Sequence, residues 1–564
     1  MTKQPGDNSL SRRKLLGYLA TASIATTGLL AAPARAFAGG NDADMPTNDK
    51  NSGTRVYNIR DYGASGDGKT LDTPALQKAI DACTNDEGGI VLVPAGVFVI
   101  GTVQLKSNVT LHIAAMGVLL GTDDGRQYYA DNNIPLTGDT TMDDGNVGLI
   151  YAVKAENFSI EGAGTIDGNG GRFRSPAKGV PSPAGISDSQ RPYHLLFYQC
   201  KNIAVNDIFL KDCAYHSLRV VQCEYAKFEG LHIHSRVIHN NDGFHFISCK
   251  YVHVSKCDVQ VEDDACALFG SCQFFTISDS SFSTRWSIFR FGGGIAENIT
   301  VSNCIIYETY GCPVKILCGR GSRIENILFS NIIMKDVTGP ISIGLTTGND
   351  GTEPLADVPG IVRNISFSNI RATVVKPVTP PYAEGNDFRT PELFSCITLN
   401  AIEDVYLENI SLSDVHVTFP GGGTAEQGAV RDVPQIAGEY FEMGIPPSYA
   451  LYARNVKGLT LQNVRFEKTA TDARPAVVFD HLEDVSVNGL SVQGDKAAES
   501  VVRCIESKSI LFNAVRGLTE SSVFMQVEGS ASKDIAVFAS DISKSAKPLK
   551  FSSGASSQSV KMNI

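Results

Sequence analysis

A short phrase that recurs along most of the chain constrains the fold more than any other feature. Each copy begins with Asn or Asp, continues with alternating apolar positions and ends in a turn; copies start at Asn202, Asn298, Asn326, Asn364, Asp404, Asp484 and Asp534. The second positions of successive phrases, from Ile203 to Ile327, are separated by 23, 26, 23, 24 and 28 residues. Self-similarity at this period indicates a solenoid, in which each repeat buries its apolar face against the next.

The composition of the repeat favours strands over helices. Its apolar residues alternate with a period of two and are largely Val, Ile and Phe. Its turns are rich in Asn, Gly, Ser and Asp, which tolerate positive φ at corners. A leucine-rich repeat would have a similar period, but its leucine scaffold is missing. We therefore expect residues 55–564 to form an all-β fold, a single-stranded right-handed parallel β-helix.

The start of the repetitive region predicts a cap for the solenoid. Asp72, Thr73 and Pro74 precede the run ALQKAIDAC, and a capping side chain followed by proline is typical of a helix N-terminus. A helix of about ten residues here would cover the open end of the coils, where strand edges would otherwise be exposed. The next segment, Gly88–Gly101, reads as two strands around a turn.

The first residues are typical of an export signal rather than of the solenoid. Arg12 and Arg13 stand before an apolar stretch, and Ala34-Arg35-Ala36 fits a small-x-small cleavage site. Paired arginines indicate the twin-arginine route, so we expect residues 1–36 to be removed and the protein to be periplasmic or secreted. An uncleaved anchor is the alternative, but the stretch is shorter than the roughly 20 residues that a span needs. Residues 37–54 are polar and are expected to be a flexible lead-in.

The net charge of the chain limits the kinds of molecule that it is expected to bind. The net charge is −11, and loss of residues 1–36 would make it −15, because that segment has five basic residues and one acidic residue. So acidic a protein lacks the clustered cations that nucleic-acid binding requires. It would also repel an acidic polymer at long range, so local basic residues must meet any acidic sugar.

Thirteen cysteines in an exported chain would ordinarily suggest disulfides. Four of them, Cys200, Cys223, Cys249 and Cys272, end similar segments at steps of 23, 26 and 23 residues. In stacked coils about 4.8 Å apart their Cβ vectors would be parallel, which suits a disulfide poorly. We therefore expect buried free thiols, as in a protein that folds in the reducing cytoplasm before export.

Long inserts interrupt the rhythm of the repeat. They fall at roughly 121–148, 167–193, 346–360, 372–395 and 420–448. Loops of this length usually carry function or wall a binding cleft. On one flank of a coil stack they would border a groove suited to an extended polymer.

Two segments carry the candidate chemistry. Asp242 stands at a turn that leads into a strand, and Asp263 and Asp264 stand at the equivalent point one coil later, with Asp263 21 residues further along. Coils stack about 4.8 Å apart, so the three carboxyl groups should cluster. Crowded like charges raise at least one pKa. An acid of raised pKa can protonate a glycosidic oxygen while ionised partners activate a water.

Two other interpretations of these acids stay open. Asp and Asn at coil corners can simply cap turns, and Asp242 alone fits that role as well as a catalytic one. Clustered carboxylates also bind calcium. Three carboxyl groups in register on adjoining coils favour catalysis, and we predict no metal or other cofactor.

The acidic segments and the N-terminal run resemble those of one known family. The run from Tyr57, YNIRDYGASGDGKTLDTPALQKAI, resembles the opening of family 28 glycoside hydrolases, the polygalacturonase group. Asn241-Asp242-Gly243 resembles that family's Asn-Thr-Asp-Gly motif, and Asp263-Asp264 resembles its paired aspartates. The resemblance implies an inverting hydrolase in which Asp263 is the general acid and Asp242 and Asp264 hold the attacking water.

The resemblance breaks in the coils beyond the paired aspartates. The family's Gly-His-Gly motif has no counterpart in Ser283–Gly292, and its Arg-Ile-Lys motif corresponds to Pro313-Val314-Lys315, which keeps only the lysine. Arg285 and Arg290 could replace the lost charge, because arginine binds a carboxylate in bidentate fashion. A surface ion pair is the alternative for both arginines. Lys315 adjoins the aspartate coils and is expected to contact substrate.

Two further residues near these coils are candidate substrate contacts. Trp286 is the only tryptophan, and it could stack on a sugar ring or fill the core. His245 follows Asp242 by three residues. At strand period it would point away from Asp242 unless the turn intervenes.

Together these features predict a hydrolase of a uronic acid-containing, pectin-like polysaccharide or oligosaccharide, such as a rhamnogalacturonan-like glycan, rather than plain polygalacturonan. We expect no nucleic-acid partner and no stable membrane association. One alternative is a β-helix polysaccharide lyase, with Lys315 or Arg285 as base and calcium as helper. The other is a non-catalytic glycan-binding solenoid. An unsaturated product, or loss of activity on chelation, would identify the lyase.

Overall fold

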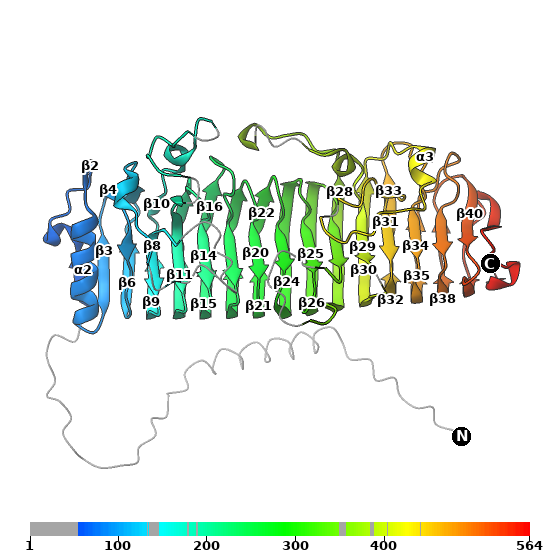
Figure 1. The fold of residues 1–564 in the computed structure, drawn as a ribbon, viewed down its shortest axis with the longest axis horizontal. Coiled ribbons are helices and arrows are strands. Elements are labelled where there is room, and N and C mark those ends of the chain that lie inside the picture. Colours follow the sequence, from blue (N-terminus) through cyan, green and yellow to red (C-terminus); the bar gives the residue numbers. More distant parts are fainter. Residues whose placement is uncertain are drawn as a thin grey trace, which may run out of the picture. The chain divides into compact units, whose positions relative to one another are not determined.

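The computed structural model describes residues 55–563, except 132–133, 135–145, 178–179, 188–189, 349–356, 384–387, 403 and 440. The predicted export signal and lead-in lie outside the described residues. In the described part, each coil pairs its strands in parallel with the coils before and after it, so that β14 (Leu218–Val221), β17 (Phe244–Ile247) and β20 (Cys266–Phe269) form consecutive rungs. The protein is a parallel β-helix, as the sequence predicts (Figure 1).

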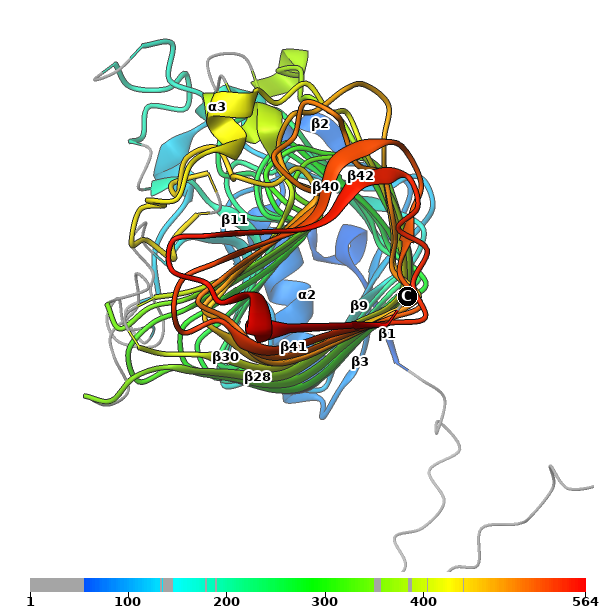
Figure 2. The ribbon, with the colours of Figure 1, turned by 90° about the vertical axis from the view of Figure 1, so that its right-hand side faces the viewer.

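Within the described ranges, the coils build two sheets, one of 15 strands and one of 28. The view along the coil axis shows them enclosing the interior (Figure 2). The fifteen-stranded sheet carries the candidate site. Besides β14, β17 and β20 it contains β5 (Val103–Gln104), β8 (Gly148–Val153), β11 (Tyr193–Tyr198), β23 (Phe289–Gly292), β25 (Val314–Cys318), β27 (Ile341–Leu345), β29 (Ile397–Ala401), β31 (Leu451–Arg454), β34 (Val477–Asp480), β37 (Val502–Ile505), β40 (Ser521–Glu528) and β42 (Ser545–Ser552).

The repeated phrase lies in the larger sheet and sets its register. Its strands here are β12 (Lys201–Asn206), β15 (Glu224–Glu229), β18 (Lys250–Ser255), β21 (Gln273–Ser278), β24 (Ile295–Thr309), β26 (Arg323–Val337), β28 (Ile361–Val374) and β30 (Leu407–Phe419). The second positions of the phrases, Ile203, Ala226, Val252, Phe275, Ile299 and Ile327, are direct partners from strand to strand. The spacing read from the sequence is therefore the coil length.

The asparagines that open these phrases form the corners. Asn326 and Asn364 have φ of 57° and 58°, a region that Asn tolerates better than most residues. Their side chains also bond from coil to coil: the Asn364 amide donates to Asn326 Oδ1 at 3.1 Å, and the Asn409 amide donates to Asn364 Oδ1 at 3.1 Å. The asparagines therefore stabilise both the turn and the stacking of the coils.

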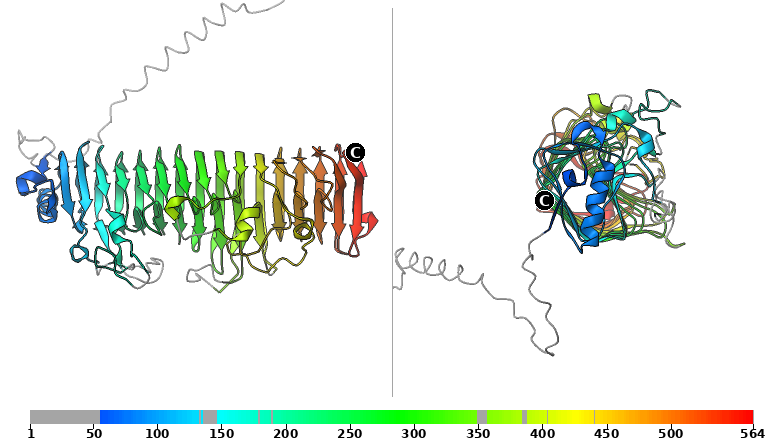
Figure 3. Two further views of the ribbon diagram at one scale, coloured as in Figure 1. Left: turned by 90° about the horizontal axis from the view of Figure 1, so that it is seen from above. Right: turned by 90° about the vertical axis from the view of Figure 1, so that its left-hand side faces the viewer.

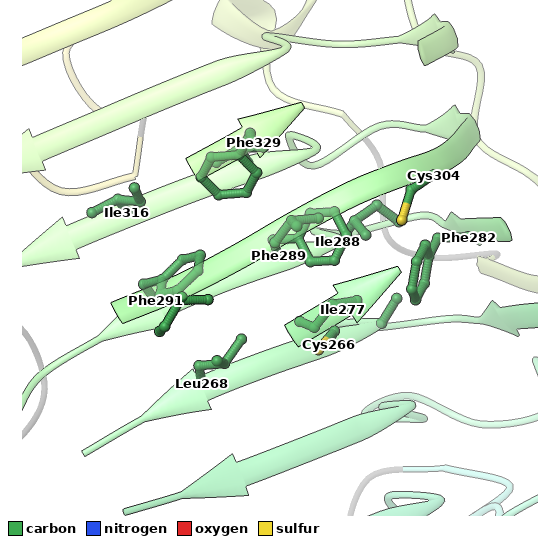
Figure 4. Packing of buried hydrophobic residues seen from close by; sticks show 14 of the residues in the cluster. Cys266, Leu268, Ile277, Phe282, Ile288, Phe289, Phe291, Cys304, Ile316 and Phe329 are labelled. Carbon is green, nitrogen blue, oxygen red and sulfur yellow. The ribbon is translucent and has the colours of Figure 1, made fainter. Parts of the chain in front are cut away.

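The interior is filled by aromatic and aliphatic side chains on successive rungs. Phe289 packs edge-on against Phe282 at 5.2 Å and lies 6.0 Å from Phe329 (Figure 4). Each such ring contributes about 1.5–3 kcal/mol through burial. All thirteen cysteines are free and buried, which confirms the predicted thiols. Cys200 and Cys223 stack as expected, with the Cys200 N–H donating to Cys223 Sγ at 3.3 Å.

The predicted cap is α2 (Thr73–Asn85), which lies across the N-terminal end of the coils (Figure 3). It buries Leu76 and Ile80 against the first strands, and β3 (Gly89–Val93) and β4 (Gly96–Ile100) follow as predicted. One detail of the prediction is wrong. Asp72 precedes the helix, but its carboxylate makes no capping bond and instead accepts the N–H groups of Ser65 and Gly66 at 2.7 and 3.0 Å. The Asp72 carboxylate thus bonds to the loop at residues 65–66 instead of to the first turn of the helix.

The described parts of the inserts 167–193, 372–395 and 420–448 lie along one side of the coils (Figures 1 and 3). The last of them includes α3 (Ala425–Gly428), the short helix between β30 and β31. Across the described ranges, no helix combines the length and the apolar character that crossing a bilayer requires.

Candidate active site

Alternation along the fifteen-stranded sheet turns one column of side chains outward. In β17, Phe244 and Phe246 belong to the core, so His245 between them points out. The residues in register with it from strand to strand are Arg219, Ala267, Arg290 and Lys315. This outward column begins beside the turns that carry the acids.

Those turns stack directly on one another. The Asn241 carbonyl accepts the N–H groups of Glu262 and Asp263 at 3.2 and 3.1 Å, and the Gly243 N–H donates to the Asp264 carbonyl at 2.9 Å. Asp242 and Asp264 are buried, and Asp263 is partly exposed. The structure thus brings the three predicted acids together on adjoining coils.

Asp263 is held by its neighbours and carries a perturbed pKa. Its Oδ1 accepts the Asp264 N–H at 2.9 Å, and its Oδ2 accepts the Asn240 amide at 3.3 Å. Burial, followed by the charge of Asp264, raises the pKa of Asp263 to about 6, against the opposing pull of Arg290 and Lys315. A proton therefore resides on this carboxyl in weakly acidic solution.

Asp242 contacts a ring nitrogen of each of two stacked imidazoles. His245 Nδ1 is 2.8 Å from Asp242 Oδ2, and His216 Nε2 is 3.6 Å from Oδ1. The two rings are 4.6 Å apart and tilted by only 9°. His245 points toward Asp242 because the turn at Gly243 separates them, so the alternation of a regular strand does not apply between the two residues. Burial, then Asp263 and Asp264, raise the pKa of Asp242.

The two histidines are neutral. Burial, then the charge of Arg219, lowers the pKa of both His216 and His245 well below the ordinary value. Their contacts with Asp242 are therefore contacts of a carboxyl group with neutral rings, which orient it without pairing a full charge.

The two carboxylate oxygens of Asp264 differ in their hydrogen bonding. Arg290 Nη1 donates to Asp264 Oδ2 at 2.9 Å. Asp264 Oδ1 is buried and has no hydrogen-bond partner among the described residues. Because buried polar atoms are nearly always satisfied, this oxygen is placed to accept a bond from a water or a substrate hydroxyl.

Arg290 and Lys315 share a fourth acid of the site, Glu439, which comes from a distant part of the chain. Lys315 Nζ is 2.5 Å from Glu439 Oε2, and Arg290 Nη2 is 3.7 Å from Glu439 Oε1. The Lys315 side chain is only 4% exposed, whereas that of Arg290 is 31% exposed. Lys315 is thus at the site, as predicted, but enclosed within it.

Trp286 and Arg285 lie beside this ion cluster. The Trp286 ring is 4.6 Å from Lys315 Nζ and packs edge-on against Phe441 at 6.1 Å. The Arg285 guanidinium is buried over the rings of Trp286 and Phe388, at 4.9 and 4.5 Å. Trp286 therefore supports the enclosure of Lys315, and Arg285 lies between aromatic rings rather than on one of the three acids.

Two groups of site residues escaped the sequence analysis, for different reasons. His216 and Arg219 stand one coil before Asp242 in CAYHSLRV, and the repeat period could have pointed to them. Glu439 lies 124 residues from its partner Lys315, inside an aperiodic insert. No periodicity or motif connects those two positions.

Ligand atoms of His216, Asp242 and His245 lie within 4.8 Å of one another, which is compatible with a metal site. The ring geometry opposes it, however. A metal ion bonds an imidazole nitrogen in the plane of the ring, and two rings tilted by 9° and stacked at 4.6 Å have no common point between their planes at bonding distance. One histidine would have to rotate before both could bind the same ion.

Comparison with known proteins places the chain in a family. The model of glycosyl hydrolases family 28 matches residues 83–391, more than half of the chain and including all three aspartates.

Named relatives are distant. An exo-poly-α-D-galacturonosidase of Dickeya chrysanthemi is 27% identical over 354 residues, which are 53% of this chain and 58% of that protein. Polygalacturonase-2 of Solanum lycopersicum is 26% identical over 384 residues, covering 64% of this chain and 76% of the relative. This chain thus spans less than two thirds of the first relative and about three quarters of the second.

Among solved structures, an exopolygalacturonase from Thermotoga maritima shares the fold, with a TM-score of 0.54 at 19% identity over 76% of this chain and 93% of that one. With the match to residues 83–391, the fold and the stacked aspartates in agreement, the chain belongs to glycosyl hydrolase family 28.

Proposed function

We propose that the protein hydrolyses glycosidic bonds in a uronic acid-containing, pectin-like glycan by an inverting acid/base mechanism. The observation that carries the proposal is the stacking of Asp242 against Asp263 and Asp264, with the pKa of Asp263 raised to about 6. A protonated Asp263 beside Asp264, which is ion-paired with Arg290, supplies the acid and the carboxylate that glycoside hydrolysis needs.

In this mechanism Asp263 is the general acid. As the bond from the anomeric carbon to the glycosidic oxygen breaks, its electron pair goes to that oxygen, which takes the Asp263 proton. Asp242 and Asp264 hold a water, whose oxygen bonds to the anomeric carbon while its proton passes to the Asp264 carboxylate, the one paired with Arg290. The open Oδ1 of Asp264 and the imidazoles that orient Asp242 support this assignment.

The substrate class rests on the relatives. The relatives from Dickeya and tomato are named for action on galacturonate polymers. Arg290 and Lys315 are paired with Asp264 and Glu439, so the uronic acid of such a substrate is assigned to a sugar subsite away from that pair.

The lyase alternative receives no support from the two candidate bases. Lys315 is enclosed and paired with Glu439, and Arg285 is buried between aromatic rings. A lyase base must reach a proton on the sugar ring.

The test is incubation with a panel of plant and microbial glycans, with products resolved by mass. Hydrolysis adds one water to each cleaved bond, whereas a lyase leaves an unsaturated sugar. Asp242→Asn and Asp263→Asn should both be inactive. Asp534→Asn, at an exposed coil corner far along the chain, is the matched control and should keep full activity. Products from the Asp263→Asn protein at the normal rate would overturn the assignment.

A further inference from the structure

The insert 420–448 runs back along the outward face of the fifteen-stranded sheet toward the aspartate coils. Outward side chains donate to its backbone carbonyls in the order of the strands: Arg503 of β37 to Gly428 and Val430, Arg454 of β31 to Val433 and Pro434, and Asn400 of β29 to Ile436. The chain then crosses β27, where a Cβ at Gly344 would lie 2.3 Å from the Ala437 carbonyl oxygen. It arrives over β25 and β23 at Glu439.

This anchoring fixes the position of Glu439. Five bonds that the sheet donates go to main-chain carbonyls of the insert, and the side chain of Arg431 in the insert pairs with Glu528 of β40, so backbone and side chain together hold the path of the insert. The arginines and the asparagine that make them are on coils beyond residue 391, outside the segment that the family model matches. Coils beyond residue 391 thus position Glu439 in a site whose other residues lie within the segment that the family model matches.

Glu439 is the ion-pair partner of two cations near the catalytic acids. It pairs with Lys315 and Arg290, and the same two cations act on the pKa of Asp263. Burial works against ionisation of Glu439, but Lys315 and then Arg290 outweigh it and hold its pKa below the ordinary value. Glu439 is therefore a carboxylate at neutral pH. Arg290 has its other contact with Asp264, so both cations are matched by acids of the chain itself.

A sugar ring that presents its glycosidic oxygen to Asp263 lies beside this cluster. A carboxylate on that ring would find Lys315 enclosed and would meet Glu439 as a like charge. A hydroxyl or hydroxymethyl group in the same place could instead donate to Glu439, whose side chain is 19% exposed.

We propose that Glu439 is a specificity-determining residue that takes the place of a sugar carboxylate on Lys315 and Arg290, so that the sugar unit beside this pair must be neutral. The inference rests on the proposed hydrolase function and narrows its substrate. The glycan that fits carries neutral sugars between uronic acids, and an uninterrupted uronate chain is disfavoured.

The experiment compares three substrates: polygalacturonate, the same polymer with its carboxyl groups reduced to alcohols, and an oligosaccharide in which neutral and uronic sugars alternate. For the wild-type protein, kcat/KM should be at least tenfold higher on either the carboxyl-reduced polymer or the alternating oligosaccharide than on polygalacturonate. Glu439→Gln should raise kcat/KM on polygalacturonate by tenfold or more and change it on the neutral-containing substrates by less than threefold. Asp432→Asn, which removes a charge from an exposed position of the same insert, should keep the wild-type preference.

Glu439→Gln leaves Lys315 buried without its ion-pair partner, which could prevent folding. A second variant therefore keeps the inference testable. The double variant Lys315→Met/Glu439→Leu removes both charges and should also lose the discrimination. An unchanged preference in Glu439→Gln, or in the double variant if the single one does not fold, overturns the inference. So does a wild-type protein that cuts polygalacturonate as well as its reduced form. A wild-type protein that cuts no glycan at all refutes the proposed function itself, which is a distinguishable result.

Discussion

Replacement of Asp263 by Asn should stabilise the protein at neutral pH while removing its activity. The pKa of Asp263 is raised from 3.8 to about 6, chiefly by burial and then by Asp264. Between these two values the native state binds more protons than the unfolded state, so stability falls as pH rises through this window. The asparagine amide of the variant cannot ionise, so the variant does not lose stability in this pH window.

The size of the effect follows from the shift. A change of roughly two units at 1.36 kcal/mol each makes the ionised Asp263 cost about 3 kcal/mol. Near pH 4 the protonated acid and the amide offer equivalent groups to Asn240 and to the Asp264 N–H, so the two proteins should be nearly equal there. By pH 8 the variant should be the more stable by about 3 kcal/mol. Loss of the Asp263 charge also relieves Asp242, which acts in the same direction.

The assay is urea unfolding from pH 4 to pH 8, followed by the fluorescence of Trp286. As the only tryptophan, and a neighbour of Lys315, it reports on the coils that form the site. Hydrolysis measured in parallel should fall by about 100-fold or more. A stability difference that does not grow with pH, or a variant that still hydrolyses glycan, would refute the reasoning about Asp263. Asp534→Asn should show no pH-dependent difference.

Three further outcomes are expected. Because Asp263 must be protonated to act, kcat should decline as pH rises above about 6, and a rate that climbs steadily to pH 8 would contradict the acid assignment. The thirteen buried cysteines should react with a thiol reagent only after denaturation, and rapid labelling of the native protein would contradict their burial. Replacing Arg12 and Arg13 by Lys should keep the protein in the cytoplasm, as fractionation of expressing cells would detect; unaffected export would exclude the twin-arginine route.

Most of the fold is encoded locally and could therefore be predicted. The spacing from Ile203 to Ile327 equals the length of a coil, because the strand partners are the same positions of successive phrases. The corner asparagines and the helix after Pro74 follow from single-residue preferences. The hydrogen bonds of Asp72 could not be predicted in this way, because no sequence pattern identifies residues 65–66 as its partners.

The candidate site could be predicted only where it follows the period of the coils. Asp242 and Asp264 occupy equivalent points of adjoining coils, each two residues before the paired Phe244 and Cys266, so the clustering of the acids was predictable from spacing. The direction of His245 depends on the turn at Gly243, which alternation alone does not specify. Glu439 could not be found, since its position depends on a tertiary path along the sheet from β37 to β25 rather than on any local pattern.

The most direct test of the central claim, that the three stacked acids form one acid/base cluster, is the anomeric configuration of the first product. Proton NMR during early turnover of a cleaved glycan should show the new reducing end in the configuration opposite to that of the broken linkage. It should show no product with the Asp242→Asn or Asp263→Asn protein. Retention of configuration would mean that a carboxylate attacks the sugar directly, and it would contradict the roles given to these acids.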